Sequence, residues 1–245
     1  MSKIDAAIIL QARMGSTRLP GKTMMPLSGY RMIHHIVTRF QVAPVLGPFI
    51  IATSDLPTDD FICSFCGSAD VQCFRGSEED VLARFYGAAQ TLENKYIVRA
   101  TADNPLVWEG AIAHLGSLIQ ELNCDYITYN EFMPIGLGLE IFTKEALDKA
   151  HTEATDIKHR EHVTPYFYTN KDIFDCVWIS PPRELEGDYR LTVDTLEDYE
   201  LMKQIYERLH KPGEIIPATK ALELLREEPH LALLNADVMQ KRYDE

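Results

Sequence analysis

The sequence lacks an apolar run that approaches the roughly 20 residues needed to span a bilayer. It also lacks a Gly/Ser tract, a Pro-rich linker, a charge block and an internal repeat that would divide its 245 residues. The N-terminal stretch MSKIDAAIILQAR has only a short apolar run that ends in polar and basic residues. We therefore expect a single domain covering residues 1–245, in a cytoplasmic protein with no membrane partner.

Basic residues are in deficit, with 24 Lys and Arg against 37 Asp and Glu, which gives a formal net charge of −13. Nucleic acids and anionic lipids are held largely by Lys and Arg against phosphate. The charge therefore argues against a nucleic-acid partner.

Cysteine is scarce and odd in number, which argues against a disulfide framework and favours reduced thiols. Cys63 and Cys66 form a CxxC pair, and Cys73 follows them, but no fourth zinc ligand stands at a suitable spacing. Buried small side chains are the simpler interpretation, and metal binding by Cys63 and Cys66 stays open. The five cysteines are Cys63, Cys66, Cys73, Cys124 and Cys176.

Short apolar or β-branched runs alternate with longer stretches of helical spacing, which predicts an α/β fold with a mostly parallel sheet. The predicted strands are Ala6–Leu10, Phe49–Thr53, Val71–Phe74, Tyr96–Arg99, Tyr126–Tyr129, Gly138–Phe142, Asp175–Ile179 and Arg190–Val193. The predicted helices are Arg31–Ala43, Glu78–Leu92, Lys144–Ala150, Leu196–Leu209 and Ala218–Glu227. Ligands of such sheets lie beyond the carboxyl ends of the strands, so the loops that follow strands come first in the search for chemistry.

The segment Gln11–Lys22, QARMGSTRLPGK, follows the first predicted strand and carries Arg13, Arg18 and Lys22 with no acidic residue. Gly15 and Gly21 permit positive φ or a close backbone approach, and hydroxyl side chains add donors. Arginine grips phosphate oxygens in a bidentate manner and lysine acts as a point charge. The segment therefore predicts a phosphate-binding loop.

The same residues almost match the Walker motif G-x-x-x-x-G-K-[ST], but five residues instead of four separate Gly15 from Gly21. Pro26 follows so closely that Lys22 and Thr23 cannot open a regular helix over the phosphates. A P-loop ATPase or kinase is therefore disfavoured.

The stretch IILQARMGSTRLPGKTMMPLSGYRMIHHIV resembles the opening of the nucleotidyltransferases that make CMP-sugars. These include CMP-N-acylneuraminate and CMP-Kdo synthetases and, more similar here, spore-coat polysaccharide cytidylyltransferase-like proteins. The resemblance implies a Rossmann-like, GT-A-type three-layer sandwich with a mixed, mostly parallel sheet, and a homodimer. It implies that Arg13, Ser16 and Lys22 contact the triphosphate of CTP, with the lysine stabilising charge in the transition state. The nucleotide-binding set that we predict is Gln11, Ala12, Arg13, Gly15, Ser16, Arg18, Lys22, Arg75 and Ser77.

Arg75 and Ser77 enter that set because FRGSEEDVLARFY is similar to the family segment that recognises cytosine. The alternative is that Ser77, followed by acidic residues, is a helix N-cap.

Asp103 and Asp194 follow predicted strands, in RATADNPL and RLTVDTLED. Such carboxylates suit Mg²⁺, which takes one or two of them and completes its shell with water and phosphate. A turn residue for Asp103 and a helix N-cap for Asp194 are the alternatives. DNPL and VDTLEDYE resemble family elements that hold the metal, which implies an Asp103 and Asp194 pair and a catalytic set of Lys22, Arg13 and Asp103.

The segments PIGLGLEIF and HREHVTPYFY resemble the spore-coat branch of the family, in which this region helps to form the acceptor pocket and the dimer interface. The predicted substrate-side residues are Glu140, Arg160, Glu161 and His162. His159 and His162 have H-x-x-H spacing but no third ligand, so a helix-surface or dimer contact is favoured over zinc.

These features together predict a cytidylyltransferase that couples CMP from CTP to a sugar acid and releases pyrophosphate, for surface polysaccharide. A GT-A-type glycosyltransferase is one alternative, although its usual Asp-x-Asp motif is replaced here by Ala-Asp-Asn at residues 102–104. A non-catalytic nucleotide or sugar sensor is the other. The sequence identifies neither the acceptor nor the group that removes its proton.

Overall fold

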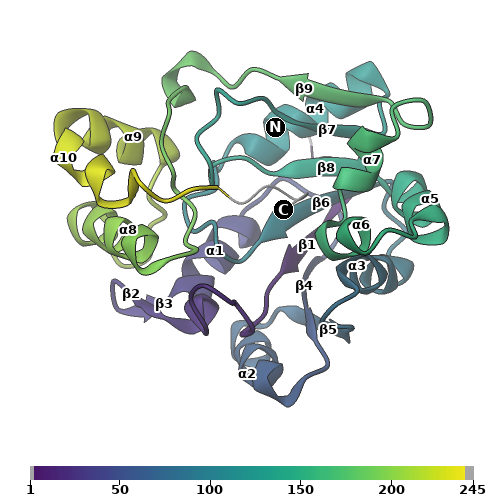
Figure 1. Cartoon of the computed structure of the whole chain (residues 1–245), viewed down its shortest axis with the longest axis horizontal. Helices are drawn as coiled ribbons and strands as arrows, with labels where there is room; N and C mark the ends of the chain where they lie inside the picture. The colour runs from purple at the N-terminus through teal and green to yellow at the C-terminus, as the bar shows by residue number, and fades with distance from the viewer. Residues whose placement is uncertain (1–2, 241–245) are drawn as a thin grey trace.

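The computed structural model describes residues 3–240, and within them the chain forms a seven-stranded sheet of order β5-β4-β1-β6-β8-β7-β9 (Figure 1). Neighbouring strands are parallel, except that β8 runs antiparallel to β6 and β7. The predicted α/β class with a mixed, mostly parallel sheet is confirmed. The strands are β1 (Ala6–Gln11), β4 (Phe49–Ser54), β5 (Gln72–Gly76), β6 (Tyr96–Thr101), β7 (Tyr126–Tyr129), β8 (Glu140–Thr143) and β9 (Cys176–Ile179).

Helices cover both faces of this sheet, because its strands carry apolar side chains on both sides. In β1, Ile8 and Leu10 belong to a core shared with α1, α4, α8 and α9, whereas Ile9 packs with α3, α5 and α7. All three side chains are fully buried. The result is three layers. The helices are α1 (Met32–Gln41), α2 (Asp60–Ala69), α3 (Val81–Gln90), α4 (Ala111–Leu122), α5 (Lys144–Glu153), α6 (Ile157–His162), α7 (Pro165–Thr169), α8 (Leu196–Leu209), α9 (Ala218–Glu227) and α10 (Pro229–Ala232).

Short elements complete the chain. The 3-10 turns are Lys22–Met24, Pro57–Asp59, Arg183–Leu185 and Leu233–Asn235, and a small hairpin joins β2 (Pro26–Leu27) to β3 (Tyr30–Arg31). Helices α8 to α10 lie on the left in Figure 1, and α3, α5 and α6 on the right. No helix within residues 3–240 is long and apolar enough to cross a membrane.

The predicted strand Arg190–Val193 is wrong. Its backbone makes one isolated bridge, between Arg190 and Ile135, and bonds to loops instead of to a neighbouring strand. The Leu191 N–H donates to the Ile135 carbonyl (2.7 Å) and the Val193 N–H to the Asp103 carbonyl (2.8 Å). Leu191 and Val193 are fully buried and alternate with Arg190 and Thr192, which explains the strand-like pattern.

Helices α8 and α9 have the predicted bounds, whereas several other elements are displaced by one to three residues at an end. The predicted helix Glu78–Leu92 begins at Val81, because the Asp80 side chain caps it by accepting from the Ala83 N–H. The Ser77 hydroxyl instead accepts from the Asp80 N–H (3.0 Å), so Ser77 is not the N-cap.

Candidate active site

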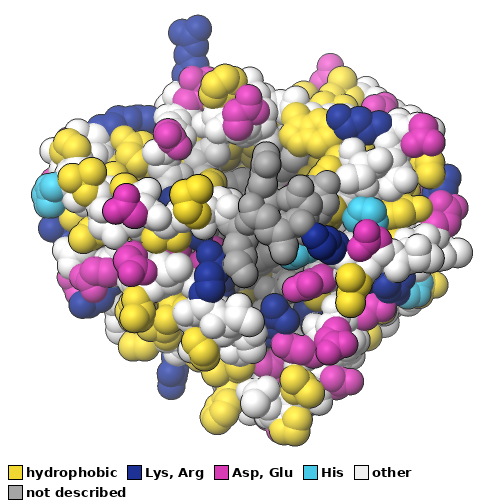
Figure 2. Space-filling model, in the orientation of Figure 1, with side chains coloured by type: hydrophobic (Ala, Val, Ile, Leu, Met, Phe, Trp, Pro, Cys, Tyr) yellow, Lys and Arg dark blue, Asp and Glu magenta, His cyan; other side chains and the backbone are white. Residues whose placement is uncertain are grey.

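A cleft of about 680 Å³ opens at the carboxyl ends of β1 and β6. We call it the main cleft. Basic side chains border the central region of this face, and acidic ones are spread over much of the rest (Figure 2). Of the residues predicted for the site, the main cleft is lined by Gln11, Ala12, Arg13, Ser16, Arg18, Lys22, Asp103, Glu140, Glu161, His162 and Asp194.

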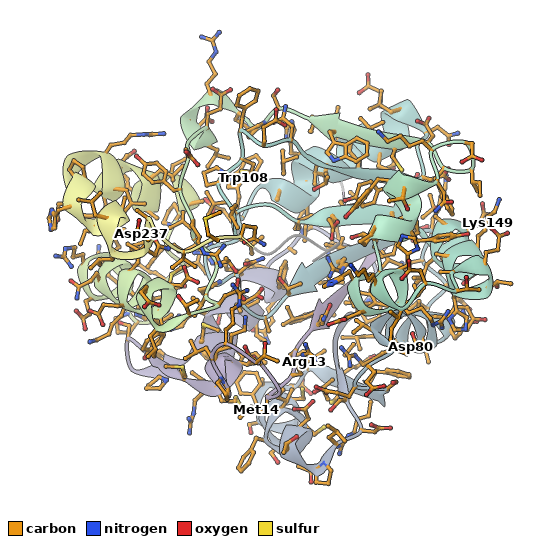
Figure 3. The ribbon with its side chains drawn as sticks, viewed as in Figure 1. Arg13, Met14, Asp80, Trp108, Lys149 and Asp237 are labelled. Carbon is orange, nitrogen blue, oxygen red and sulfur yellow. The ribbon has the colours of Figure 1, made fainter. Side chains whose placement is uncertain are left out.

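The loop after β1 forms one wall of the cleft and is held by few but well-placed bonds. The Met14 N–H donates to Asp59 Oδ1 (2.7 Å), and the Thr23 hydroxyl donates to the Arg13 carbonyl (3.2 Å). Gly21 has φ of 74°, a left-handed conformation that glycine adopts without strain. Arg13 and Met14 lie together at the end of β1 (Figure 3).

Lys22 and Thr23 enter a single 3-10 turn that ends at Met24, so no regular helix N-terminus faces the cleft from the loop. This geometry agrees with the exclusion of a Walker loop. Gly15 does not line the cleft. A Cβ there would lie 2.6 Å from Glu78 Oε1, so its role in this conformation is to let the carboxylate approach the loop.

Lys22 joins the loop to both predicted metal carboxylates. Its Nζ lies 3.1 Å from Asp103 Oδ2 and 2.7 Å from Asp194 Oδ1. Asp103 is placed by the turn after β6, where its Oδ1 accepts from the Thr101 hydroxyl (2.5 Å). The three charges therefore meet at one point although they come from three distant parts of the chain.

Burial by itself would lower the pKa of Lys22, but the carboxylates of Asp103 and Asp194 outweigh it and raise that pKa above its ordinary value. Burial would likewise raise the pKa of Asp194, but Lys22, Arg18 and Arg190 lower it overall. Lys22 is thus a cation and Asp194 an anion near neutral pH.

Asp194 is positioned by a hydrogen-bond network that was not predicted from the sequence. Arg190 Nη2 donates to Asp194 Oδ2 (2.7 Å) and Arg190 Nε to Asp198 Oδ1 (2.9 Å). Thr195, not Asp194, caps α8, in a capping box with Asp198. The alternative role of Asp194 as N-cap is therefore wrong. The spacing R-x-x-x-D-x-x-x-D in RLTVDTLED was a signal for this network.

Asp103 and Asp194 suit a hard divalent cation, because one oxygen of each already converges on the Lys22 ammonium. Within residues 3–240 no group of three His, Cys, Asp or Glu side chains is arranged to hold a metal ion. A Mg²⁺ ion held by Asp103 and Asp194 would complete its shell with water and phosphate oxygens, the usual mode of Mg²⁺ binding.

Two further cations of the loop are paired with acids. Arg13 Nη1 lies 3.1 Å from Glu78 Oε1, and Arg18 Nη2 lies 3.0 Å from Asp194 Oδ2. The Arg13 and Arg18 side chains keep 31% and 29% of their surface exposed. Both can therefore reach an anion in the cleft without being uncovered first.

Besides Gly15, three predicted residues are not brought to the main cleft. Arg75 bonds to Asp60 Oδ1 (2.6 Å) and to the backbone carbonyls of Ser54 and Leu56. Arg160 bonds to Asp80 Oδ2 (2.7 Å) and to two carbonyls at the end of α5. Ser77 stays in the turn before α3. In this structure they support neighbouring backbone, and their binding roles stay predictions.

A second cavity, of about 570 Å³, adjoins the main cleft and shares Arg99, Asn104 and Glu140 with it. We call it the aromatic pocket, because its wall includes five aromatic side chains. The aromatic side chains are Phe40, Tyr126, Tyr129, Tyr168 and Trp178.

Arg99 and Glu140 form an ion pair where the two cavities meet, and the Tyr126 hydroxyl donates to Glu140 Oε1 (2.5 Å). Arg99 Nε and Asn104 Oδ1 are buried and have no hydrogen-bond partner among the described atoms. Such unpaired groups are costly unless a ligand or water meets them. Arg99 was not among the residues predicted for the site, although an arginine in the apolar strand YIVRAT was a signal.

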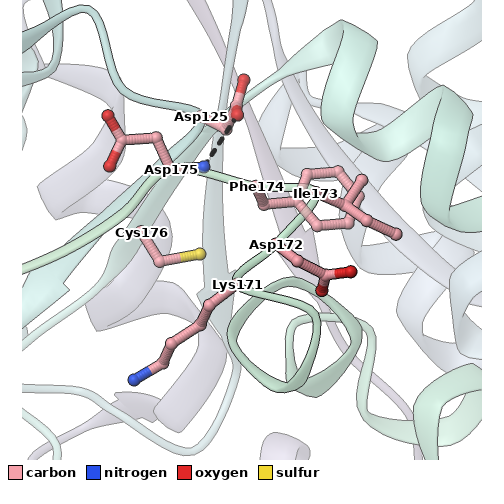
Figure 4. A pocket seen from close by; sticks show the side chains of 7 residues that line it. All are labelled: Asp125, Lys171, Asp172, Ile173, Phe174, Asp175 and Cys176. Atoms are coloured by element: carbon pink, nitrogen blue, oxygen red, sulfur yellow. Dashed lines mark hydrogen bonds between the residues drawn. The ribbon is translucent and has the colours of Figure 1, made fainter.

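A third cavity, of about 410 Å³, lies at the amino ends of β7 and β9, away from the loop. Its wall combines three aspartates with Lys171, two apolar side chains and a cysteine, and the Asp175 N–H donates to Asp125 Oδ2 (3.0 Å; Figure 4). It shares no lining residue with the main cleft.

Comparisons with known proteins agree with this geometry. The sequence model of the family described as cytidylyltransferase matches residues 7–235. The chain is 33% identical over 234 residues to the spore coat polysaccharide biosynthesis protein SpsF of Bacillus subtilis, covering 93% of this chain and 97% of that protein. It is 29% identical over 220 residues to the 8-amino-3,8-dideoxy-manno-octulosonate cytidylyltransferase of Shewanella frigidimarina, covering 82% and 85%.

A solved structure of a cytidylyltransferase from Leptospira borgpetersenii superimposes with a TM-score of 0.86 at 27% identity, covering 98% of this chain and 99% of that one. The predicted resemblance is confirmed, and the match extends over almost the whole sequence. The chain belongs to the cytidylyltransferase family of nucleotidyltransferases.

Proposed function

We propose that the protein transfers CMP from CTP to a hydroxyl of a sugar acid and releases pyrophosphate. The observation that carries the proposal is the meeting of Lys22, Asp103 and Asp194 beside a loop with two more cations. Phosphoryl transfer requires mainly positioning and neutralisation of charge, which this arrangement supplies. The similarity to the 8-amino-3,8-dideoxy-manno-octulosonate cytidylyltransferase supports a sugar acid as the acceptor.

The loop after β1 binds the triphosphate in this proposal. Arg13, Arg18 and the hydroxyl of Ser16 line the cleft and provide donors, and Lys22 neutralises the charge that develops on the phosphates. Asp103 and Asp194 would hold Mg²⁺, which supplies charge neutralisation at the phosphate oxygens when bound.

The aromatic pocket receives the acceptor sugar. Its walls combine flat aromatic faces with a few polar groups, the usual composition of a small-molecule site. Arg99 Nε is a buried donor and Asn104 Oδ1 a buried acceptor, and neither has a hydrogen-bond partner among the described atoms. The carboxylate and the hydroxyl groups of a sugar acid would supply these partners. Glu140 lines both cavities, so the acceptor hydroxyl meets the α-phosphorus close to this carboxylate.

His162 and Glu140 are two of the cleft groups that can accept the hydroxyl proton. Burial lowers the pKa of His162, so its imidazole is neutral at pH 7 and able to act as a base. The oxygen attacks the α-phosphorus, the bond to the β-phosphate oxygen breaks, and pyrophosphate leaves with that electron pair.

The test is pyrophosphate release measured with CTP, UTP, ATP and GTP against a panel of sugar acids, neutral sugars and phosphonates, with the product mass determined. CTP with a sugar acid should give a CMP adduct. Release with a nucleotide sugar and not with a free triphosphate would instead identify a glycosyltransferase. Absence of turnover together with CTP binding would identify a sensor.

Variants then separate the two subsites. Trp178→Ala should raise the KM of the acceptor while leaving the KM of CTP almost unchanged, since Trp178 lines the aromatic pocket and not the main cleft. Arg18→Gln should do the reverse, because Arg18 lines only the main cleft of the two. Equal effects of both variants on both substrates would contradict the division of the cavities.

A further inference from the structure

Three thiols gather at the edge of the sheet farthest from the aromatic pocket. Cys63 and Cys66 lie on one turn of α2, and Cys73 lies on the edge strand β5. The Sγ atoms of Cys73 and Cys63 are 3.3 Å apart. Cys73 is exposed, Cys63 is half-buried and Cys66 is buried. The proposed cytidylyl transfer uses none of them.

The fold holds two of these thiols together by a second, parallel contact. Cys73 and Arg75 share a face of β5, since side chains of a strand repeat every two residues. Asp60 and Cys63 share a face of α2, since residues three apart are neighbours on a helix. The ion pair of Arg75 Nη1 with Asp60 Oδ1 (2.6 Å) joins β5 to α2, as does the contact of Cys73 with Cys63. The ion pair therefore aligns the two thiols.

A disulfide has an S–S length of about 2.05 Å, so the two sulfurs need to approach by only about 1.3 Å. We propose that Cys63 and Cys73 are a reversible oxidation site that forms an intramolecular disulfide with hydrogen peroxide or a small-molecule disulfide. With peroxide, the two thiols lose two protons and two electrons, the S–S bond forms, and the peroxide becomes two molecules of water.

A metal is not the better explanation of this cluster. Within the described part of the chain, no three His, Cys, Asp or Glu side chains are arranged to hold a metal ion. The metal role that the CxxC spacing left open therefore has no support in the geometry, whereas a two-thiol reaction needs only the contact that is present.

The disulfide would connect two parts that support the main cleft. Helix α2 begins directly after Asp59, whose carboxylate anchors the loop through the Met14 N–H. Strand β5 leads through Gly76 to Glu78, the partner of Arg13. Oxidation therefore fixes the helix behind the loop to the strand that leads to its ion-pair partner.

The experiment oxidises the full-length protein with hydrogen peroxide or oxidised glutathione and maps peptides under non-reducing conditions. We expect a loss of two hydrogen atoms, a Cys63–Cys73 crosslink, and recovery of both thiols with dithiothreitol. Burial raises the pKa of the Cys63 thiol to about 11, so the rate should increase as the pH is raised, because the thiolate is the nucleophile. Cys73 also contacts Cys66 and lowers the pKa of that thiol, so the peptide map must distinguish a Cys63–Cys73 link from a Cys66–Cys73 link.

Variants give the controls. Cys63→Ser and Cys73→Ser should each abolish the crosslink, while Cys176→Ser, which changes a half-buried thiol elsewhere, should retain it. Arg75→Gln should slow crosslinking, because it removes the ion pair that aligns the thiols. The peptide map of the oxidised wild-type protein tests the proposal even if one of the variants fails to fold. An absent intramolecular link, or a link through Cys66, Cys124 or Cys176 in place of Cys63, overturns the proposal.

Discussion

Replacing Lys22 by methionine removes one charge from the centre of the site while keeping a side chain of similar length. Only 9% of Lys22 is exposed, and its Nζ is shared by Asp103 and Asp194. Removing one partner of a buried ion pair costs about 3–5 kcal/mol, because a charge is left without compensation. Here the Asp103 side chain is 25% exposed and Asp194 keeps Arg18 and Arg190.

We therefore expect the lower end of this range, a loss of about 3 kcal/mol in the free energy of unfolding. For a chain of this size that corresponds to a fall of about 6–12 °C in Tm. Pyrophosphate release should fall by about 100-fold or more, since a group that meets developing charge is lost. Calorimetry and a coupled pyrophosphate assay measure the two effects.

Mg²⁺ provides a readout that does not depend on turnover. If Asp103 and Asp194 hold the metal, Lys22→Met leaves two carboxylates without their shared cation, so Mg²⁺ should raise the Tm of this variant more than that of the wild type. Lys220→Met is the matched control, because Lys220 is an exposed lysine on α9 paired with Glu223. An unchanged Tm and an unchanged rate in Lys22→Met would refute the reasoning.

Three further predictions concern residues that support the site or the fold. Burial holds the pKa of His35 at about 4 against 6.5 for an unperturbed histidine, so the unfolded chain binds a proton first and stability falls as the pH drops through this range. Between pH 7 and pH 5, the free energy of unfolding measured in urea should fall by about 2 kcal/mol less in His35→Gln than in the wild type. His230→Gln, a change at an exposed histidine, is the control and should behave like the wild type. Gly136→Ala should cost about 3 kcal/mol or more, because φ is +95° and a Cβ would lie 2.5 Å from the Leu191 backbone. Gly213→Ala, with φ of +81° and nothing within 4 Å of the added Cβ, should lower the free energy of unfolding by only about 1–2 kcal/mol. Equal losses in the two variants would contradict a steric clash at Gly136. Asp59→Asn should weaken CTP binding measured by calorimetry, since Asp59 accepts hydrogen bonds from the Met14 N–H of the loop and from three donors of Thr53 and Ser54. Asp172→Asn, a change at an exposed residue, is the control. Identical CTP affinities of the two variants would contradict this role of Asp59.

Much of the fold was visible in local patterns. The bounds of α8 and α9 were predicted correctly because each carries a regular apolar face, with Thr195 before α8 and Pro217 before α9. The strand predicted at Arg190–Val193 failed because an alternation of apolar and polar residues resembles a strand whether or not a neighbouring strand supplies hydrogen bonds. The spacing of apolar residues indicates which side chains are buried, whereas the hydrogen bonding of a strand depends on where the rest of the chain places its neighbours.

The sequence by itself determined the fold class, the cationic loop and the carboxylates that follow strands, because each depends on residues close together in the chain. Only the tertiary structure decided that Lys22 lies between Asp103 and Asp194, which are 81 and 172 residues away from it. It also decided that Arg75 and Arg160 bond to nearby backbone and carboxylates while Arg99, unremarked in the sequence, stands at the junction of two cavities. The reason is physical: strand order and direction set which loops meet, and no local propensity encodes that order.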